Sequence, residues 1–426
     1  MTRLPSNPSL KHLRLEAKSL LKAHKNGDTS CCSILRQLHQ FKDKTDVEVV
    51  RAKVSLQEVQ FALAMEYGFK NWTELKKSAL KRISTGQFLH IHPGDASGEI
   101  LRESKIPGDV LVWREIYVEG PVPGNLPERD FLEIRAKFLA TTFGLDYDAL
   151  VQGGSERHKR IKEADKYDEV ILWFDACMFD QTIMIHLMDL CARQPWEKTK
   201  LSLICIGEFA GIDRFSGLGE LSPGQLASLF ETRHEVTQEE KNLAGKAWQA
   251  FTSDDPRDIE KLLQGDCSAL PYLRDAMVRH LQQFPSVRNG LNRLENQILA
   301  AAASGAKKLG EIFRTVSDME ERRFAGDTSV WRCIHQLAAC RKPLLLVSGP
   351  CSLTELLKIN SGEQPDLKRK KRRLFEVDIT EIGKEALAGR RDAVGLNGID
   401  KWIGGVHLQG AEAVWRWDEA NGKLTT

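Results

Sequence analysis

The sequence predicts an α/β protein in three parts: a helical N-terminal domain (residues 1–84), a doubly wound, mainly parallel sheet domain (87–265), and a C-terminal winged-helix-like α+β domain (268–426). Three observations support this division. Apolar residues follow helical spacing up to about residue 82, short apolar runs then alternate with helices, and a helix-rich stretch with two strands follows from 268. The 426 residues suit about three domains of roughly 150 residues each.

The composition is that of an ordinary globular protein, with 42% hydrophobic and 28% charged residues. No apolar run approaches the roughly 20 residues of a membrane span, and the first residues lack the apolar core of a signal peptide. The nine cysteines are scattered without a C-x-x-C pair. We therefore expect a reduced, cytoplasmic protein with no membrane partner. The net charge is only +2, so any attraction to nucleic acid would be local.

The first part of the chain is predicted to be helical. In "PSLKHLRLEAKSLLKAHKNGD" the leucines recur at helical spacing behind Ser9, a candidate N-cap. Ser55 and Glu58 form a candidate capping box for a later helix. This segment resembles the helical leader that precedes repeat or enzyme-like domains in many bacterial proteins. A helix-turn-helix is the alternative interpretation, and a helical docking domain is favoured over it.

The middle of the chain alternates between strands and helices. The predicted strands are "FLHIH", "DVLVW", "EVILWF" and "LSLICIG", and helices such as "DQTIMIHLMDLCARQ" separate them. Short, nearly continuous apolar strands divided by helices are typical of a parallel sheet that is covered on both faces.

Three helices are predicted between about 291 and 342, followed by a strand near 343–347 and a returning strand, "RRLFEVDIT". This is the order of a winged helix. The segment 348–372 would lie in or beside the wing, and its Gly, Ser, Pro and Lys content predicts a flexible loop.

Several stretches together carry a resemblance to a family. They are "LHIHPGDASGEILRESKIPGDVLVWREIYVEGPVP", "VILWFDACMFDQTIMIHLMDL", "GIDRFSGLGELSPGQLASLFETRHEV" and "LPYLRDAMVRHLQQFPSVRNGLNRLENQIL". Over roughly residues 88–420 the chain resembles an uncharacterised bacterial family catalogued as domain of unknown function 1835, which has no activity to transfer. The family pattern has acid-His-Asp where this chain has Asp175, Ala176 and Cys177, and its Gly-Asp-Ser turn becomes Gly94-Asp95-Ala96, with Ser97 one place later. A His or Ser that did chemistry at either place would be lost here.

Polar side chains follow each predicted strand. In an open parallel sheet, ligands bind beyond the carboxyl ends of the strands. Carboxylates in such places suit Mg²⁺ and phosphate together, and arginines can hold a phosphate bidentately. The candidate ligand-binding residues are Asp95, Arg114, Glu115, Glu119, Asp175, Asp180, Gln181 and Arg214.

Each of these features also has a plain structural interpretation. Asp180 would make a good helix N-cap, and Gly94-Asp95 is a common strand-to-helix turn. His90 and His92 share a face of the first strand and are read as satisfied strand histidines rather than metal ligands. Cys177 is read as an ordinary thiol rather than a nucleophile. The cofactor is left unknown, with Mg²⁺ as a candidate, and neither metal ligands nor catalytic residues are assigned.

The winged-helix order implies nucleic-acid contact through the third helix, "TSVWRCIHQLAACRK", and through the wing. The basic run "KRKKRR" would contact phosphates. The alternatives are a protein docking unit and a solvated loop. The candidate nucleic-acid-binding residues are Arg332, Gln336, Arg341, Lys342, Lys368, Arg369, Lys370, Lys371, Arg372 and Arg373.

Two functions follow from these observations. The first is a regulatory or accessory factor, in which the α/β domain senses a small phosphorylated ligand and the winged-helix-like domain docks on nucleic acid or protein. The alternative is a metal-assisted hydrolase or transferase acting on a nucleotide or phosphate ester. An interaction scaffold is a third option. The sequence does not decide whether the protein is an enzyme, and it does not specify an oligomeric state.

Overall fold

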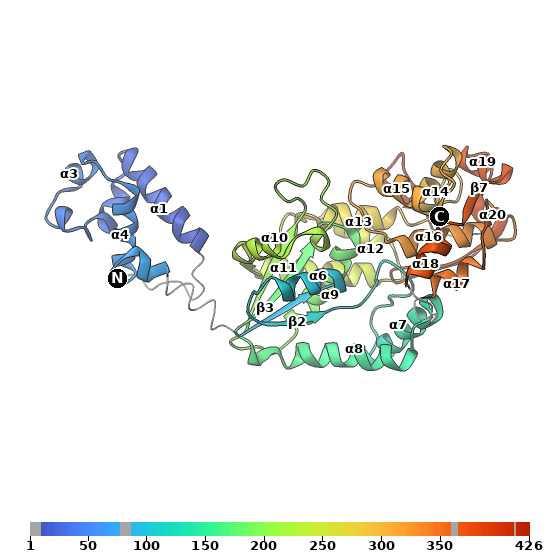
Figure 1. Cartoon of the computed structure of the whole chain (residues 1–426), viewed down its shortest axis with the longest axis horizontal. Coiled ribbons are helices and arrows are strands. Elements are labelled where there is room, and N and C mark those ends of the chain that lie inside the picture. Colours follow the sequence, from blue (N-terminus) through green and yellow to red (C-terminus); the bar gives the residue numbers. More distant parts are fainter. Residues whose placement is uncertain (1–9, 77–86, 359–364, 413–414) are drawn as a thin grey trace.

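The computed structural model describes residues 10–76, 87–358, 365–412 and 415–426 (Figure 1). None of the helices within these ranges is long and apolar enough to cross a membrane.

The N-terminal part is a small helical unit with its own core, which Leu35, Val59 and Leu63 help to form. The predicted capping box is confirmed, because Ser55 N donates to Glu58 Oε2 at 2.8 Å and Glu58 N donates to Ser55 Oγ at 3.3 Å. Ser9 and residues 77–84, which the prediction assigned to this domain, lie outside the described residues. The elements are α1 (Leu10–Lys25), η1 (Thr29–Cys31), α2 (Cys32–Leu35), η2 (His39–Phe41), α3 (Asp46–Arg51) and α4 (Leu56–Glu66).

The central part is built on a five-stranded sheet with the order β2-β1-β3-β4-β5. The first four of these strands are parallel, and β5 pairs antiparallel with β4. The α/β fold and the mainly parallel sheet are therefore confirmed. The strands are β1 (Phe88–His92), β2 (Asp109–Val112), β3 (Glu169–Asp175), β4 (Lys200–Ile206) and β5 (His234–Glu235).

Helices cover both faces of this sheet, as alternate residues of the fully buried strand β3 show. Leu172 belongs to the core that includes residues of α9 and α11, whereas Trp173 belongs to a separate core that includes residues of α6 and α10. Figure 1 shows the long helix α8 at one border of the central part. The helices are α6 (Asp95–Glu103), α7 (Glu128–Phe143), α8 (Tyr147–Lys162), α9 (Met178–Ala192), α10 (Pro223–Leu229), α11 (Gln238–Thr252), α12 (Arg257–Gln264) and α13 (Leu273–Leu281), with short turns η3 (Ala164–Lys166), η4 (Leu218–Glu220) and η5 (Phe230–Thr232).

The C-terminal unit has a separate core, to which Ile298, Ile312, Ile334 and Phe375 contribute. Three helices precede strand β6, which pairs antiparallel with β7. The elements are α14 (Arg293–Ala303), α15 (Leu309–Met319), α16 (Asp327–Ala339), β6 (Leu345–Ser348), α17 (Leu353–Leu357), α18 (Pro365–Arg372), β7 (Glu376–Ile379), α19 (Glu381–Leu387) and α20 (Ala393–Asn397).

The prediction of a flexible loop over 348–372 is wrong where the structure describes this segment, because it contains helices α17 and α18. Most of the basic run lies in α18, and Lys and Arg are good helix formers. Arg372 is also fixed in place: its guanidinium lies 4.6 Å from the centre of the Trp331 ring and 3.5 Å from Asp327 Oδ2. These contacts anchor the end of a helix that like-charge repulsion alone would disfavour.

The packing also shifts the predicted domain boundary at 268. Helix α13 and the C-terminal strands share the core of the sheet domain, since Met277, Ile403 and Trp417 belong to the same cluster as Leu172. The chain therefore leaves the sheet domain after α13 and returns to it after α20. The returning strands are β8 (Ile399–Ile403), β9 (Val406–Gly410), β10 (Arg416–Asp418) and β11 (Lys423–Thr425).

Candidate ligand site at the carboxyl edge of the sheet

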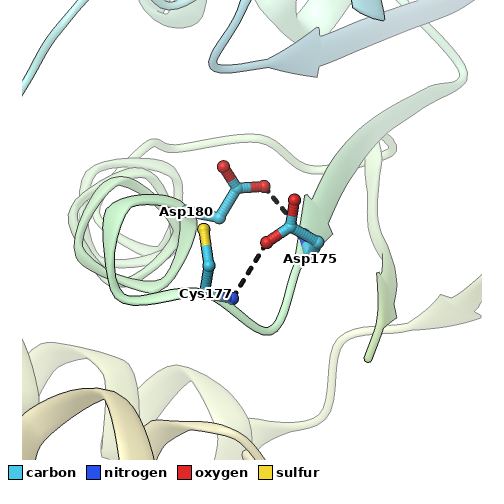
Figure 2. A group of neighbouring side chains, drawn as sticks. All are labelled: Asp175, Cys177 and Asp180. Carbon is cyan, nitrogen blue, oxygen red and sulfur yellow. Dashed lines mark hydrogen bonds between the residues drawn. The ribbon is translucent and has the colours of Figure 1, made fainter. Parts of the chain in front are cut away.

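Two carboxylates and a thiol meet where β3 ends and α9 begins (Figure 2). Asp175 Oδ1 accepts a hydrogen bond from Cys177 N at 2.9 Å, and Asp180 Oδ2 accepts one from Asp175 N at 2.8 Å. Asp180 is therefore not the N-cap of α9, which is Cys177. Its carboxylate instead folds back onto the end of the strand and fixes the turn between strand and helix.

Burial dominates the electrostatics of this group. It raises the pKa of Asp175, although the amides of Cys177 and Leu218 donate to that carboxylate. It raises the pKa of Asp180 well above its usual range, and the neighbouring Asp175 raises it further. The pKa of the Cys177 thiol is also raised, first by burial and then by the two acids. Two carboxyl groups this close do not both ionise readily, so the pair favours the protonated form of one carboxyl more than two isolated acids would.

One ligand atom from each of these three residues lies within 4.8 Å of the others. The set suits Mg²⁺ poorly, because one oxygen of each carboxylate already accepts a backbone amide and a thiol is a soft ligand. The arrangement is better suited to holding a proton than to holding this hard cation.

A small cavity of about 280 Å³ opens beside this group. The carboxyl ends of β1 and β3 and the loop after β4 form its walls, and a segment ahead of α16 closes it. Its lining residues are Pro93, Gly94, Ser97, Asp175, Cys177, Phe179, Asp180, Ser216, Gly217, Leu218, Gly219, Arg323, Phe324, Ala325 and Gly326. Asp175 and Asp180 therefore meet at this edge of the sheet, together with residues that the sequence did not single out as ligands.

Ser97 is one of these additional residues. Its Oγ lies 3.1 Å from His92 Nδ1 and 3.4 Å from the carbonyl oxygen of Gly94. His92 is 1% exposed, and within the described residues its Nε2 has no hydrogen-bond partner. Burial lowers the pKa of His92 to about 4. The displaced serine in the turn Gly94-Asp95-Ala96-Ser97 was the sequence signal for this pair.

His90 differs from its neighbour on the same strand. Its Nε2 lies 3.0 Å from the carbonyl oxygen of Pro107, and its Nδ1 lies 3.1 Å from the Trp173 Nε1 that donates to it. Both ring nitrogens are satisfied, as the structural interpretation of His90 predicted. His92 departs from that interpretation, because its Nε2 has no partner among the residues that the structure describes.

Asp95 and Arg114 form an ion pair beyond the ends of β1 and β2, with 2.7 Å between Oδ1 and Nη2. The guanidinium of Arg114 lowers the pKa of Asp95. Both side chains are about 60% exposed, and neither lines the small cavity. Exposed pairs of this kind contribute little to stability, so this pair forms a polar rim.

Glu115 has a structural partner. Its Oε2 lies 2.7 Å from Arg135 Nη2 on α7, and both side chains are buried. Arg135 also donates to the carbonyl oxygens of Ile116, Glu119 and Pro121. This network fixes the loop after β2 against α7, so the Glu115 carboxylate is occupied inside the protein and does not reach the small cavity.

Two other predicted residues are also engaged by the protein itself. Gln181 is fully buried and donates to the carbonyl oxygen of Asp175 at 2.7 Å. Arg214 extends to the end of α15, where its Nη1 lies 3.1 Å from Asp318 Oδ1. Neither side chain lines the small cavity.

A larger cavity of about 600 Å³ lies between the sheet domain and the C-terminal unit. Glu119, in the loop after β2, forms an ion pair with Arg332 of α16 in its wall. The lining residues are Ile116, Val118, Glu119, Gly120, Phe138, Thr142, Phe143, Phe179, Gln283, Asn292, Leu294, Phe324, Ala325, Gly326, Asp327, Thr328, Ser329, Arg332, Cys333, Gln336, Asp400, Lys401 and Trp402. Phe179 and the segment Phe324–Gly326 line both cavities.

The predicted nucleic-acid-binding residues differ in how far they are exposed to solvent. Arg332 faces Glu119 rather than solvent, and Arg372 packs on Trp331, so both are taken up by contacts within the protein. Lys371 is half-buried, and the side chains of Lys368 and Arg369 lie outside the described residues. The exposed members are Gln336, which borders the larger cavity, and Arg341, Lys342, Lys370 and Arg373.

In comparisons with known proteins, no protein-family model and no curated protein matches the chain.

Proposed function

We propose that this protein is a regulatory or accessory factor that binds a small organic anion in the larger cavity and docks on nucleic acid through its C-terminal unit. The proposal of ligand binding rests on one observation: both the sheet domain and the C-terminal unit contribute to the walls of the larger cavity. The loop after β2 and helix α7 supply one side, and the start of α16 supplies another. A ligand held there contacts both parts of the protein and stabilises one arrangement of them over others.

The cavity supports a ligand that combines a flat apolar portion with an anionic one. Its volume falls in the range of roughly 300–1,000 Å³ that is usual for small-molecule sites. Aromatic side chains in the lining offer surfaces on which a planar ring can stack. They are Phe138, Phe143, Phe179, Phe324 and Trp402.

The anionic portion would bind at the start of α16. The N-cap of this helix is Gly326, which has no side chain to bond the first amides. Within the described residues, Arg332 Nε on the same helix is buried without a hydrogen-bond partner. Thr328 N already donates to Asp327 Oδ1, so the anion would bind to other amides of the first turn and to the guanidinium N–H of Arg332. A nucleotide or another phosphorylated ring compound has the matching chemistry.

A thermal-shift screen with AMP, GMP, a sugar phosphate and inorganic phosphate tests this proposal. A ligand at 100 times its Kd should stabilise the protein by about 2.7 kcal/mol. Arg332→Gln should abolish the shift, whereas Arg341→Gln, on the same unit but outside the cavity lining, should retain it. Absence of a shift with every compound, or an equal shift in both variants, would contradict the proposal.

The second half of the proposal rests on the order of elements in the C-terminal unit. Three helices followed by an antiparallel strand pair is the order of a winged helix. Because Arg332 is engaged by Glu119, the candidate surface shifts to the end of α16 and to α18. Arg341, Lys342, Lys370 and Arg373 are exposed there and supply the positive charge that a phosphate backbone requires.

Membership of the family catalogued as domain of unknown function 1835 stays part of this proposal, supported by the sequence stretches that carry the resemblance.

A further inference from the structure

We propose that Ser97 is a nucleophile with His92 as its base, and that the small cavity accepts the acyl group of an ester of a short carboxylic acid. This activity is independent of the ligand proposed for the larger cavity. It rests on the hydrogen bond between the two side chains, on the position of the serine in the cavity wall, and on the helix ends that surround it.

The serine is placed as a nucleophile requires. It is the third residue of α6, its side chain lines the small cavity, and its Oγ lies 3.1 Å from His92 Nδ1. This separation is within the range over which a general base can accept a hydroxyl proton. A ligand in the cavity would therefore contact the serine oxygen, while the imidazole stays behind it in the protein.

The imidazole is held in the form that accepts a proton. Burial is the main cause of the lowered pKa of His92, which keeps the ring neutral at pH 7. The positive charge of Arg102 and the neighbouring His90 lower this pKa further, whereas Asp95 raises it. In the tautomer that carries the ring hydrogen on Nε2, Nδ1 would offer its lone pair to Ser97, and the hydroxyl would turn from Gly94 O to His92. His92 Nε2 is buried with no partner among the described residues, which has a cost in stability.

Backbone amides can stabilise the oxyanion that this reaction forms. Gly94 is the N-cap of α6 and Cys177 is the N-cap of α9, and both residues line the cavity. Gly94 has no side chain to bond the first amides of α6, and Cys177 makes no capping bond to α9. Preorganised amides aimed at developing negative charge are a large source of rate enhancement.

The chemistry balances without a cofactor. Ser97 Oγ forms a bond to the ester carbonyl carbon as its proton passes to His92 Nδ1. The tetrahedral intermediate then breaks its carbon–oxygen bond to the alcohol, which leaves with the proton from His92. Water attacks the acyl-serine, gives a proton to His92 and releases the acid, and Ser97 Oγ takes that proton back.

The size of the cavity sets the substrate class. Its roughly 280 Å³ suits an acetyl or propionyl group better than a long acyl chain. Phe179, Leu218 and Phe324 supply apolar surface against that group. Because the cavity shares Phe324–Gly326 with the larger one, the alcohol portion would lie toward that side.

The full-length protein can be tested with a fluorophosphonate probe and with 4-nitrophenyl acetate. The probe forms an Oγ–P bond and releases fluoride, with the serine proton passing to His92. Peptide mapping of the labelled wild-type protein should place the adduct on Ser97, without relying on any variant. An adduct elsewhere, or no adduct, would overturn the proposal.

Variants then separate catalysis from structure. Ser97→Ala should abolish labelling and ester turnover, and His92→Gln should lower both by about 100-fold or more. Ser104→Ala is the matched control, because this serine is the C-cap of the same helix, where it donates to Leu101 O and accepts from Ile106 N, away from the cavity. Labelling that persists in Ser97→Ala, or that His92→Gln leaves unchanged, would refute the roles given to these residues.

The pH dependence gives a readout that a structural serine would not show. Labelling should fall below about pH 5, as His92 takes up a proton, and should be flat from pH 6 to 8. A rate that rises tenfold per pH unit between 6 and 8 would indicate an unassisted hydroxyl and would overturn the assignment of His92.

Discussion

Arg332 of α16 and Glu119 of the loop after β2 form an ion pair between the C-terminal unit and the sheet domain, in the wall of the larger cavity. The side chains are 23% and 10% exposed. The pair is therefore largely shielded from water, and it joins the two parts of the protein that a ligand would contact.

Glu119→Gln should lower the free energy of unfolding by about 1–2 kcal/mol, because it leaves a mostly buried guanidinium without its charged partner. Urea denaturation followed by circular dichroism provides the measurement. Asp95→Asn is the control, since it breaks an ion pair of which both members are about 60% exposed, and the expected cost is at most about 1 kcal/mol. Equal losses of unfolding free energy in the two variants would show that the shielded pair stabilises the protein no more than the exposed pair does.

Arg135→Met should be more damaging, by about 3–5 kcal/mol, because it strands the buried carboxylate of Glu115. It also removes the donors to three carbonyl oxygens in the loop after β2. The same denaturation experiment applies. Arg129→Met should have little effect, because the Arg129 side chain is 85% exposed and pairs with Glu133 on the same helix. Similar midpoints for both variants would contradict the prediction.

The pKa of Asp180 is raised in the folded protein, which fixes the direction of its pH effect. Its contribution to stability is complete below its unfolded pKa and is lost as the pH rises through the folded value. Asp180→Asn, which keeps an oxygen to accept from Asp175 N, should make the fall of stability above pH 4 less steep. The measurement is the free energy of unfolding at pH 4, 5, 6 and 7. Parallel curves for variant and wild type would argue against a raised pKa.

The exposed lysine and arginine of α18 should contribute to salt-dependent binding. Changing both Lys370 and Arg373 to Ser should reduce the log–log salt slope of duplex DNA binding by about 1.8, at roughly 0.9 per phosphate contact. Thermal stability should hardly change, because both side chains are exposed. A fluorescence anisotropy titration at several salt concentrations provides the slopes.

The matched control for α18 is the double change of Lys42 and Lys53 to Ser, which removes two exposed charges from the helical N-terminal unit. Its salt slope should equal that of the wild type. If both double variants gave the same slope, α18 would not be the docking surface.

Local patterns were enough to predict the sheet and part of its edge. Asp175 and Asp180 could be placed there because they follow an apolar strand and precede an apolar helix. Whether an acid at such a place is free depends on partners that spacing does not reveal. Glu115 is bound by Arg135, 20 residues later, and Glu119 by Arg332, 213 residues later.

The basic run and the serine show two further limits. The Gly, Ser, Pro and Lys content of 348–372 predicted a loop, but helix α18 also depends on Trp331 and Asp327, which contact Arg372 at its end. Ser97 and His92 are only five residues apart. Their contact arises from the exact path of the turn between β1 and α6, which residue types alone do not fix.

The C-terminal unit leaves the sheet domain and rejoins it at nearly the same point, because Ala393 N donates to Asn289 O at 2.7 Å. It is thus an insertion in the sheet domain, and the two chain segments that connect it to that domain lie side by side. A gene could gain, lose or exchange such an insertion by one recombination event. Replacing residues 290–392 by a short linker would therefore keep the C-terminal strands of the sheet domain but would remove Glu320, the buried partner of Arg279. A truncation at residue 290 would also remove those strands from the core.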